Sequence, residues 1–310
     1  MAFGMIGLGK MGGNMARRLR RAGVEVVGFN QDVSATDALA SEVGLVAAES
    51  AAALVEKLDA PRCVWLMLPA GDVTEAYVQQ MRELLEPGDV LIDGANSYYK
   101  DSMRRGELLA ESGVHFVDAG VSGGIWGLDN GYALMVGGTD EAFAKIRPII
   151  ETLAPAPEQG WIHTGPVGSG HFVKMIHNGI EYGMMQAYAE GFSLMKSRED
   201  FGLDLAGIAE TWRHGSVVRS WLLDLTANIL AEDQQLEDID PFVADSGEGR
   251  WTALEGIEQG IPTPVMSLAL MARFASQGQQ DFSGKLLSTM RNQFGGHAIR
   301  AADDAIKGAG

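Results

Sequence analysis

The sequence FGMIGLGKMG, at residues 3–12, joins an apolar run to the spaced glycines Gly7, Gly9 and Gly12. The apolar residues 3–6 predict a buried β-strand, and the residues that follow Gly12 have helical spacing. Glycines in the order G-x-G-x-x-G between a strand and a helix are typical of the turn that holds a dinucleotide pyrophosphate. Gly7 permits the tight turn, Gly9 lets the backbone approach the phosphates, and Gly12 lets the helix pack against the strand. A glycine turn with only a structural role is the alternative.

Apolar runs with strand character recur along the first half of the chain, at residues 24–29, 64–68, 90–93 and 116–118. Helical stretches lie between them, and this alternation predicts a parallel, doubly wound sheet of the Rossmann type. The glycine-rich segment at residues 165–170 then interrupts the pattern.

Beyond this segment the sequence has long helical patterns without strand alternation. Residues 172–196 keep helical spacing over about seven turns of 3.6 residues, which predicts one long helix within an all-helical domain. We therefore expect two domains in an α/β plus all-α fold: a Rossmann domain at residues 1–165 and a helical domain at residues 166–310. The active site is expected in the cleft between them.

The composition restricts the partners that the chain attracts. Its 310 residues carry 24 basic and 41 acidic side chains, and the net charge of −17 argues against general attraction to nucleic acid or to an anionic membrane. Cys63 lies in an apolar run, so we interpret it as a buried structural thiol. The N-terminus lacks the basic region of a signal peptide, and no apolar stretch reaches the roughly 18 residues of a membrane span. We expect a cytoplasmic protein.

The end of the second predicted strand, Asn30-Gln31-Asp32, bears on the choice of cofactor. In dinucleotide-binding folds an acidic side chain after this strand meets the ribose 2′-hydroxyl of NAD, whereas an arginine accommodates the 2′-phosphate of NADP. No arginine stands at these positions, and Asp32 would repel a phosphate dianion. We therefore predict NAD as the cofactor, with NADP less favoured. The alternative is that Asp32 only caps the following helix.

Four polar residues of the long predicted helix form a second chemical signal: Lys174, His177, Asn178 and Glu181. Their spacing of i, i+3, i+4 and i+7 places them on one face of the helix. In an apolar setting, burial and a nearby positive charge lower the pKa of a lysine, which then serves as a general base. Glu181 would be the proton donor. An ion-pair stripe on a solvated face is the alternative.

Together with DGANS at residues 93–97 and VSGG at residues 121–124, this helix resembles 6-phosphogluconate dehydrogenase, of the β-hydroxyacid dehydrogenase superfamily. The motifs that carry the resemblance run from residue 7 to residue 297. The string HNGIEY at residues 177–182 is specific, because the more distant hydroxyisobutyrate-type dehydrogenases share the helix lysine but not this string. The length is similar to that of the short, NAD-preferring form, which lacks the duplicated helical half of the long form.

The resemblance implies oxidative decarboxylation of 6-phosphogluconate to ribulose 5-phosphate and CO2 with reduction of NAD, a step of the pentose phosphate pathway and of gluconate utilization. Lys174 would take the proton of the C3 hydroxyl while hydride passes to the nicotinamide. Glu181 would protonate the enediol that forms when the 3-keto acid loses CO2. No metal is expected, since protonation and the electron-withdrawing ketone support the decarboxylation.

By the same resemblance, the residues that hold the carboxylate and hydroxyls of the substrate are Asn96, Ser122, Gly123, Gly124, His177 and Asn178. Those that hold its phosphate are Tyr182, Arg273, Arg291 and His297. The cofactor site comprises Gly7, Leu8, Gly9, Lys10, Met11, Gly12, Asn30, Gln31, Asp32, Leu68, Pro69, Ala70 and Asn96. In the family the C-terminal segment reaches into the partner subunit's site, so we expect a homodimer or homotetramer, with the helical domain serving substrate binding and dimerisation.

One segment departs from the family pattern. Where the long form has a phosphate-binding lysine before a tryptophan, this chain has Ser246, with Glu248 nearby and Arg250 as a candidate replacement. The departure keeps a rival function open, an NAD-dependent dehydrogenase of a non-phosphorylated 3-hydroxy acid or sugar acid. A catalytically silent NAD-binding protein is a second rival, and the intact pair of Lys174 and Glu181 argues against it.

Overall fold

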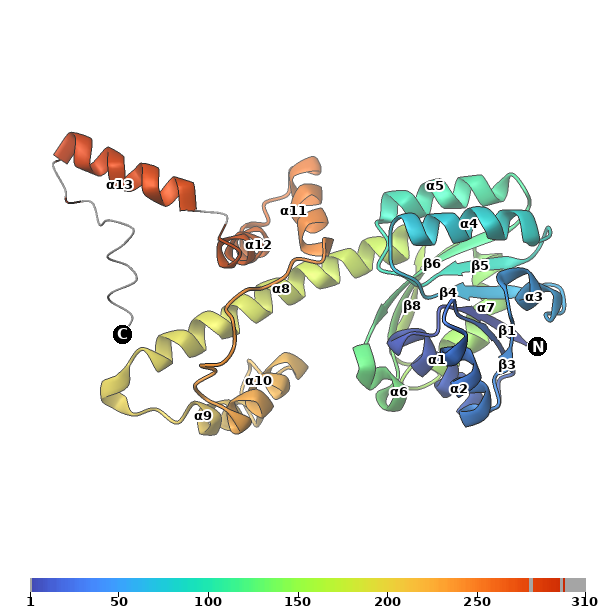
Figure 1. The fold of residues 1–310 in the computed structure, drawn as a ribbon, viewed down its shortest axis with the longest axis horizontal. Helices are drawn as coiled ribbons and strands as arrows, with labels where there is room; N and C mark the ends of the chain where they lie inside the picture. Colours follow the sequence, from blue (N-terminus) through green and yellow to red (C-terminus); the bar gives the residue numbers. More distant parts are fainter. Residues whose placement is uncertain (1, 279–280, 296–297, 299–310) are drawn as a thin grey trace. The chain divides into compact units, whose positions relative to one another are not determined.

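The computed structural model of the chain describes residues 2–278, 281–295 and 298 (Figure 1). The chain divides into two compact units, Met1–Asn178 and Gly179–Gly310. The division falls inside one continuous helix, α8 (Ser169–Lys196), which agrees with the long helix predicted at residues 172–196. The domain boundary near residue 165 stays a prediction, because α8 contributes residues to both units.

Residues 2–178 build one eight-stranded sheet with the order β3-β2-β1-β4-β5-β6-β7-β8. Its strands are β1 (Phe3–Ile6), β2 (Val26–Phe29), β3 (Val46–Ala47), β4 (Cys63–Leu66), β5 (Val90–Asp93), β6 (His115–Ser122), β7 (Ala133–Gly137) and β8 (Trp161–Gly165). Neighbouring strands are parallel except β6 and β7, which are antiparallel. The strand order reverses between β1 and β4, the place where doubly wound sheets bind ligands at the carboxyl ends of their strands. The predicted fold class of the N-terminal part is therefore confirmed.

Alternate strand residues face opposite helical layers. Met5 and Trp65 pack in one hydrophobic core, and Ile6 and Val64 pack in the other. The first core includes α1 (Lys10–Arg21), α2 (Val33–Val43) and α7 (Asp140–Leu153), and the second includes α3 (Ala51–Glu56), α4 (Asp72–Leu84) and α5 (Tyr99–Ala110). Figure 1 shows α1 and α2 on one side of the sheet and α4 and α5 on the other. Strands buried on both faces appear as continuous apolar runs, which is why the sequence reveals them.

The strand β6 is longer than predicted: it spans His115–Ser122, whereas the sequence indicated only residues 116–118. Its second half contains Gly120 and ends at Ser122, residues with low strand propensity. Antiparallel pairing with β7, in which Ser122 lies opposite Ala133, extends the strand. The short β3 and the strands β7 and β8 were not predicted.

Burial raises the pKa of the Cys63 thiol in β4 to about 11, in line with the structural role predicted for it.

The second unit is helical. After Gly165 the described residues contain no strand, which confirms the all-helical character predicted for the C-terminal part. Besides the end of α8, the unit contains α9 (Leu205–Arg213), α10 (Trp221–Glu232), α11 (Glu248–Glu258), α12 (Pro264–Ser276) and α13 (Asp281–Gly295). One small core joins α8, α9 and α10, and another joins α8, α11 and α12. Within the described ranges, we find no helix with the length and apolar character needed to cross a membrane.

Candidate functional site

The glycine turn after β1 has the geometry that its motif predicts. Gly7 has a φ of +92°, and an added Cβ would overlap the carbonyl oxygen of Met67. A Cβ on Gly12 would overlap the carbonyl oxygen of Gly7. At Gly9, in contrast, no described atom lies within 4 Å of where a Cβ would stand. The turn is therefore tightly packed at its first and third glycines and open at the middle one.

The helix that follows this turn offers an anion site. Gly9 is the N-cap of α1, and among the described residues no side chain caps this end and no acid stands in the first turn. The amide N–H groups of a first helical turn have no partner within the helix and attract anions. Leu8 N–H donates to Asn30 Oδ1 at 2.9 Å, which ties the turn to the end of β2. Lys10 is exposed and Met11 is half-buried. These residues fit a dinucleotide pyrophosphate.

The residues after β2 are exposed at the carboxyl edge of the sheet. Asp32 Oδ1 accepts hydrogen bonds from Ser34 N–H at 3.0 Å and from Ser34 Oγ at 2.6 Å. These bonds lower the pKa of Asp32 and cap α2. The capping role raised as an alternative is thus present in the structure. Because both bonds use Oδ1, the cap and a contact with a ribose hydroxyl do not exclude each other. Gln31 beside it is exposed.

The turn after β4 lies next to the glycine turn. A Cδ atom of Leu68 stands 2.9 Å from where a Cβ on Gly7 would be, so these two turns are in direct contact. Thr74, in the first turn of α4, donates from Oγ1 to the Pro69 carbonyl oxygen at 2.8 Å and holds the turn in place. Pro69 and Ala70 are exposed, and Leu68 is half-buried.

Asn96 is exposed on a rigid loop after β5. The buried carboxylate of Asp93 accepts from Ala95 N–H at 3.0 Å, from Ser97 Oγ at 2.8 Å and from Arg105 Nη1 at 3.0 Å. These bonds fix the residues on both sides of Asn96. The sequence analysis missed the roles of Asp93, Ser97 and Arg105, although an acid at the end of an apolar strand was a visible signal.

The same network continues to α4. Arg105, only 1% exposed, donates from Nε to Glu75 Oε2 at 2.9 Å, and Arg104 binds the same carboxylate at 2.7 Å. Hydrogen bonds from Arg104 and then Arg105 lower the pKa of Glu75 to about 2. The loop that carries Asn96 is thus anchored by a buried ion pair, whose strength depends on every partner remaining in place.

Helix α8 packs closely on β6 through glycines. A Cβ on Gly120 would overlap the Lys174 Cβ, and a Cβ on Gly170 would lie 2.5 Å from the Asp118 carbonyl oxygen. Only glycine permits this approach of helix to strand. Lys174 is thereby placed against the carboxyl half of β6, two residues from its end at Ser122.

Two buried side chains anchor the first turn of α8. The Asp118 carboxylate accepts hydrogen bonds from Gly168 N–H and His171 N–H, both at 2.7 Å. His171 Nδ1 lies 2.7 Å from Ser102 Oγ on α5, and both residues are buried. A carboxylate at a helix N-terminus is favoured by the helix dipole. This anchor was not predicted from the sequence, because its bonded residues are 50 to 69 positions apart and only the tertiary fold brings them together.

The predicted base and three of the predicted substrate residues of the first unit form one hydrogen-bonded cluster: Lys174, Asn178, His177 and Ser122. Lys174, 7% exposed, donates from Nζ to Asn178 Oδ1 at 2.7 Å. His177 Nδ1 lies 3.1 Å from the same oxygen, and His177 Nε2 lies 3.5 Å from Ser122 Oγ. An amide oxygen only accepts, so Nδ1 of His177 is the donor toward Asn178. The burial of Lys174 and Asn178 contradicts the alternative of a solvated stripe.

Gly123 and Gly124 follow Ser122 with φ values of +131° and +53°. These conformations favour glycine and leave the backbone of the segment accessible at Gly124, which is exposed. Glu181 is half-buried and stands two helical turns after Lys174 along α8.

In the second unit the structure brings Tyr182, Arg273 and Ser246 together. The Arg273 guanidinium lies 3.4 Å from the centre of the Tyr182 ring, and Tyr182 OH lies 3.1 Å from Ser246 Oγ. Arg273 also donates to the Ala244 carbonyl oxygen at 2.9 Å. Two of the predicted phosphate residues are therefore neighbours, and the Ser246 hydroxyl lies beside them.

The remaining residues considered for the phosphate differ in what the structure shows of them. Arg250 forms an ion pair with Asp245 at 2.6 Å, which weakens the case for it as the lysine replacement. Glu248 is buried, and its Oε2 has no hydrogen-bond partner among the described residues. Arg291 is exposed on α13, and His297 lies outside the described residues. Across the described part of the chain we find no group of three or more His, Cys, Asp or Glu residues arranged to hold a metal ion.

Comparison with known proteins gives consistent matches. Residues 2–165 match the NAD binding domain of 6-phosphogluconate dehydrogenase, and residues 170–283 match the C-terminal domain of 6-phosphogluconate dehydrogenase. A relative from Haloferax volcanii, named 6-phosphogluconate dehydrogenase, NAD(+)-dependent, decarboxylating, is 41% identical over 305 residues, 98% of this chain and 100% of that protein. An NADP(+)-dependent, decarboxylating 6-phosphogluconate dehydrogenase from Bacillus subtilis is 36% identical, over 90% of this chain and 62% of that protein.

Among solved structures, 6-phosphogluconate dehydrogenase of Plasmodium falciparum is similar, with a TM-score of 0.83 and 31% sequence identity. The match covers 97% of this chain and 66% of the Plasmodium chain, so this chain is the shorter of the two. The chain belongs to the 6-phosphogluconate dehydrogenase family.

Proposed function

We propose that this protein is an NAD-dependent, decarboxylating oxidoreductase that converts 6-phosphogluconate to ribulose 5-phosphate and CO2. The observation that carries the proposal is the hydrogen-bonded cluster of the buried Lys174 and Asn178 with the half-buried His177 and Ser122, which lies in the same unit as the open glycine turn. The activity named for the Haloferax relative, which aligns over its full length, supports it.

The cluster provides the residues for the first step. NAD, when bound, accepts the hydride from C3 of the substrate. Lys174 takes the proton of the C3 hydroxyl, and Asn178 orients the amine through its 2.7 Å hydrogen bond. After CO2 leaves, Glu181 protonates the enediol at the carbon that becomes C1. Asn96, Ser122, Gly123, Gly124 and His177 are proposed to hold the carboxylate and hydroxyls.

The phosphate is assigned to the second unit. Tyr182 and Arg273, already in contact, supply a hydroxyl and a cation. Arg291 and His297 are proposed to complete the site from a partner subunit. Two observations favour the alternative of a non-phosphorylated 3-hydroxy acid or sugar acid: Ser246 stands where the resemblance implies a lysine, and Asp245 neutralises Arg250.

We assign NAD as the preferred cofactor because the exposed Asp32 and Gln31 present no cation to a 2′-phosphate. The cofactor residues of the glycine turn, of the loop after β2 and of the Leu68–Ala70 turn lie at the carboxyl ends of neighbouring strands β1, β2 and β4.

Exposed apolar side chains in the second unit support self-association. Ile257 on α11 is 77% exposed, and Val265 and Leu268 on α12 are 69% and 66% exposed. Where such side chains gather into one patch, they mark a protein interface. A homodimer or homotetramer and a cytoplasmic location complete the proposal, with no nucleic-acid or membrane partner.

A steady-state comparison tests the function. Production of NADH is measured with 6-phosphogluconate, gluconate and 3-hydroxyisobutyrate, each with NAD and with NADP. We expect the highest kcat/KM for 6-phosphogluconate with NAD. An equal or higher value for an unphosphorylated acid would favour the alternative substrate class, and absence of NADH with every substrate would favour a silent NAD-binding protein.

Two variants test the assigned roles. Lys174→Ala removes the base and should lower kcat by about 100- to 10,000-fold, the usual contribution of a positioned base, with the Kd for NAD near that of the parent. Glu181→Gln keeps the shape and should lower kcat more than it raises KM. Retained turnover in Lys174→Ala would remove this lysine as the base, and a mainly binding defect in Glu181→Gln would count against its role as an acid.

A further inference from the structure

We infer that Arg18, on α1, is a positioning residue that ties the substrate-contacting segment after β6 to the helix that receives the cofactor. The inference rests on the proposed function, because it takes residues 122–124 as substrate contacts and the N-terminus of α1 as the pyrophosphate site. Arg18 lies in the C-terminal half of α1 and is distant in sequence from the proposed catalytic residues Lys174 and Glu181.

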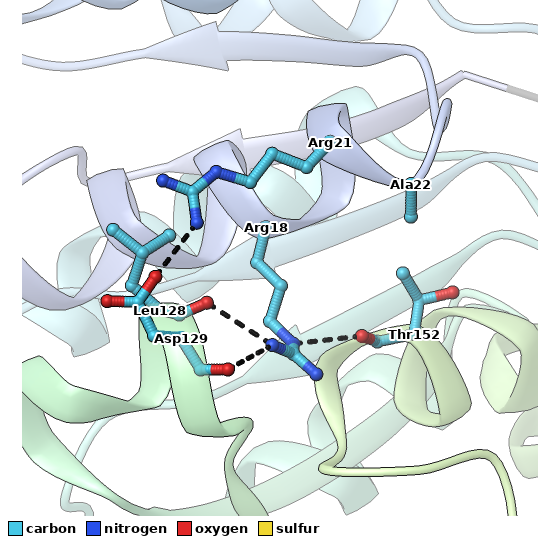
Figure 2. Close-up of a pocket in the computed structure, with 6 residues that line it drawn as sticks. All are labelled: Arg18, Arg21, Ala22, Leu128, Asp129 and Thr152. Carbon is cyan, nitrogen blue, oxygen red and sulfur yellow. Dashed lines mark hydrogen bonds and ion pairs between the residues drawn. The ribbon is translucent and has the colours of Figure 1, made fainter.

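One guanidinium group holds the ends of two other helices, as Figure 2 shows for three of its bonds. Nη1 of Arg18 donates to the carbonyl oxygens of Leu128 at 3.2 Å and Asp129 at 3.5 Å, in α6 (Gly127–Asn130). Its Nε donates to Thr152 O at 3.1 Å and its Nη2 to Ala154 O at 2.6 Å, at the end of α7. The last carbonyl groups of a helix have no partner within it, and a cation is favoured there.

Two further residues of α1 hold the same segment. Asn14 Nδ2 donates to the Ile125 carbonyl oxygen at 3.3 Å, and Arg21 Nη1 binds Asp129 Oδ1 at 3.0 Å (Figure 2 shows the second bond). The stretch from residue 125 to residue 129 is therefore attached to α1 at both ends and along its length.

The glycines between β6 and this stretch make the attachment functionally important. Gly123 and Gly124 both have positive φ, and glycine has little conformational preference of its own. Their conformation is therefore set by what lies on each side. Ser122 is held upstream by its pairing with Ala133, and the bonds from α1 hold the downstream side. Arg18 thus sets where the Gly123–Gly124 backbone lies relative to the cofactor helix.

The arginines of the pocket drawn in Figure 2 make these same attachments. The pocket has a volume of about 300 Å³ and is lined by Arg18, Arg21, Ala22, Leu128, Asp129 and Thr152. The guanidinium groups of Arg18 and Arg21 already bind protein oxygen atoms, so the two cations of the pocket serve the fold instead of an anionic ligand.

The chain contains a matched control on the same helix. Arg20 also donates to backbone carbonyl oxygens, from Nε to Val43 at 3.1 Å and from Nη1 to Val24 at 3.0 Å. These contacts join α1 to the end of α2 and to the loop before β2. Loss of Arg20 should therefore affect stability to a similar degree without acting on residues 122–129.

The experiment compares Arg18→Lys with Arg20→Lys in the full-length protein. For each variant, kcat, the KM for 6-phosphogluconate, the Kd for NAD without substrate and the Tm are measured. We expect Arg18→Lys to raise the KM for 6-phosphogluconate about tenfold, because small displacements of positioning groups are costly, with the Kd for NAD within about twofold of the parent. Arg20→Lys should show a similar loss of Tm and an unchanged KM.

Equal changes of KM in the two variants, or a Kd for NAD that rises in parallel with the KM, would overturn the inference while the parent enzyme remains active. An inactive parent would overturn the proposed function, and the inference with it. If Arg18→Lys does not fold, Asn14→Asp decides: it keeps the oxygen that accepts from Arg17 and loses the donor to Ile125, which should raise the KM about threefold, the equivalent of one hydrogen bond. An unchanged KM in Asn14→Asp would then overturn the inference.

Discussion

The N-termini of α1 and α11 are built from similar sequence and have opposite electrostatic character. Each follows a glycine-rich segment and has a glycine as N-cap, Gly9 in α1 and Gly247 in α11. In α1 the described first turn contains no acid. In α11 the first turn contains Glu248, and the Asp245 carboxylate accepts the Gly247 N–H at 3.0 Å.

This difference shows that a glycine at a helix N-terminus indicates an anion site only where no acidic side chain of the protein lies beside it. At α1 the partial positive charge of the helix is left for an external anion. At α11 carboxylates of the protein itself lie near the helix end, so a phosphate bound as we propose would gain little from it and would depend on Arg273 and the hydroxyls of Tyr182 and Ser246. We expect tight cofactor binding at the first site and modest phosphate binding at the second.

The largest effects are expected from adding one methyl group at the start of each helix. In Gly12→Ala the Cβ overlaps the Gly7 backbone, which cannot move away, so the Kd for NAD should rise by more than about 100-fold. In Gly249→Ala the Cβ meets the Tyr182 ring, so the KM for 6-phosphogluconate should rise while the Kd for NAD stays unchanged. Calorimetric titration with NAD and steady-state kinetics measure the two effects. Retained NAD affinity in Gly12→Ala would contradict the assignment of the first turn.

A second variant tests the preference for NAD over NADP. Combining Gln31→Arg with Asp32→Thr adds a cation and removes an anion where the 2′-phosphate of NADP would lie. The ratio of kcat/KM for NADP to that for NAD should rise roughly 10- to 100-fold, because a charged hydrogen bond contributes about 1.5–3 kcal/mol. The Asp32→Thr change retains a side-chain oxygen that can cap α2, so the Tm serves as the control. An unchanged ratio would mean that other residues select the cofactor.

A third variant tests whether the substrate phosphate binds beside Tyr182. Ser246→Lys restores a cation beside Tyr182 and should lower the KM for 6-phosphogluconate about tenfold at low salt, with a smaller effect at high salt. Gluconate, which has no phosphate, is the matched control and should show no gain. An equal gain for gluconate would show that the phosphate does not bind at this cluster.

The smallest expected effect concerns the acid stability of the first site. The pKa of Glu75 in the folded protein, about 2, lies below its ordinary value of 4.5, so its contribution to stability is fully present above pH 4.5 and is lost as the pH falls from 4.5 to 2. Because the side chain is 28% exposed, the contribution is about 1–2 kcal/mol after solvent screening. Glu75→Gln should therefore unfold more easily than the parent at pH 7. Denaturant titrations at pH 7 and pH 3 measure the difference, which should narrow at the lower pH; a constant difference would contradict the ionic origin.

Much of the molecule could be predicted from local sequence. The strands β1 and β5 agree with their predicted bounds, and the spacing of Gly7, Gly9 and Gly12 predicted both the tight packing and the open position of the turn. The helical spacing of Lys174 and Asn178 placed them on one face of the helix, and the structure shows them in contact, since residues four apart on a helix are neighbours.

The supporting contacts of the site could not be predicted in this way. Asp118 with His171, Asp93 with Arg105, and Arg18 with Leu128 join residues far apart in the chain. No local pattern encodes such pairs, and the charged residues among them resemble ordinary surface charge until the fold buries them.

The sequence by itself determined the dinucleotide turn, the alternation that gives a doubly wound sheet, the stripe on α8 and the family. These features depend on backbone conformation and on periodicities of two and 3.6 residues, which are local properties. Only the tertiary structure decided that Asp32 caps α2, that Arg250 is neutralised by Asp245, and that one arginine of α1 holds the segment after β6. The first two pairs are close in the sequence, two and five residues apart, and the fold selects them among the partners within reach. The third joins residues 110 apart, so only long-range packing brings it about.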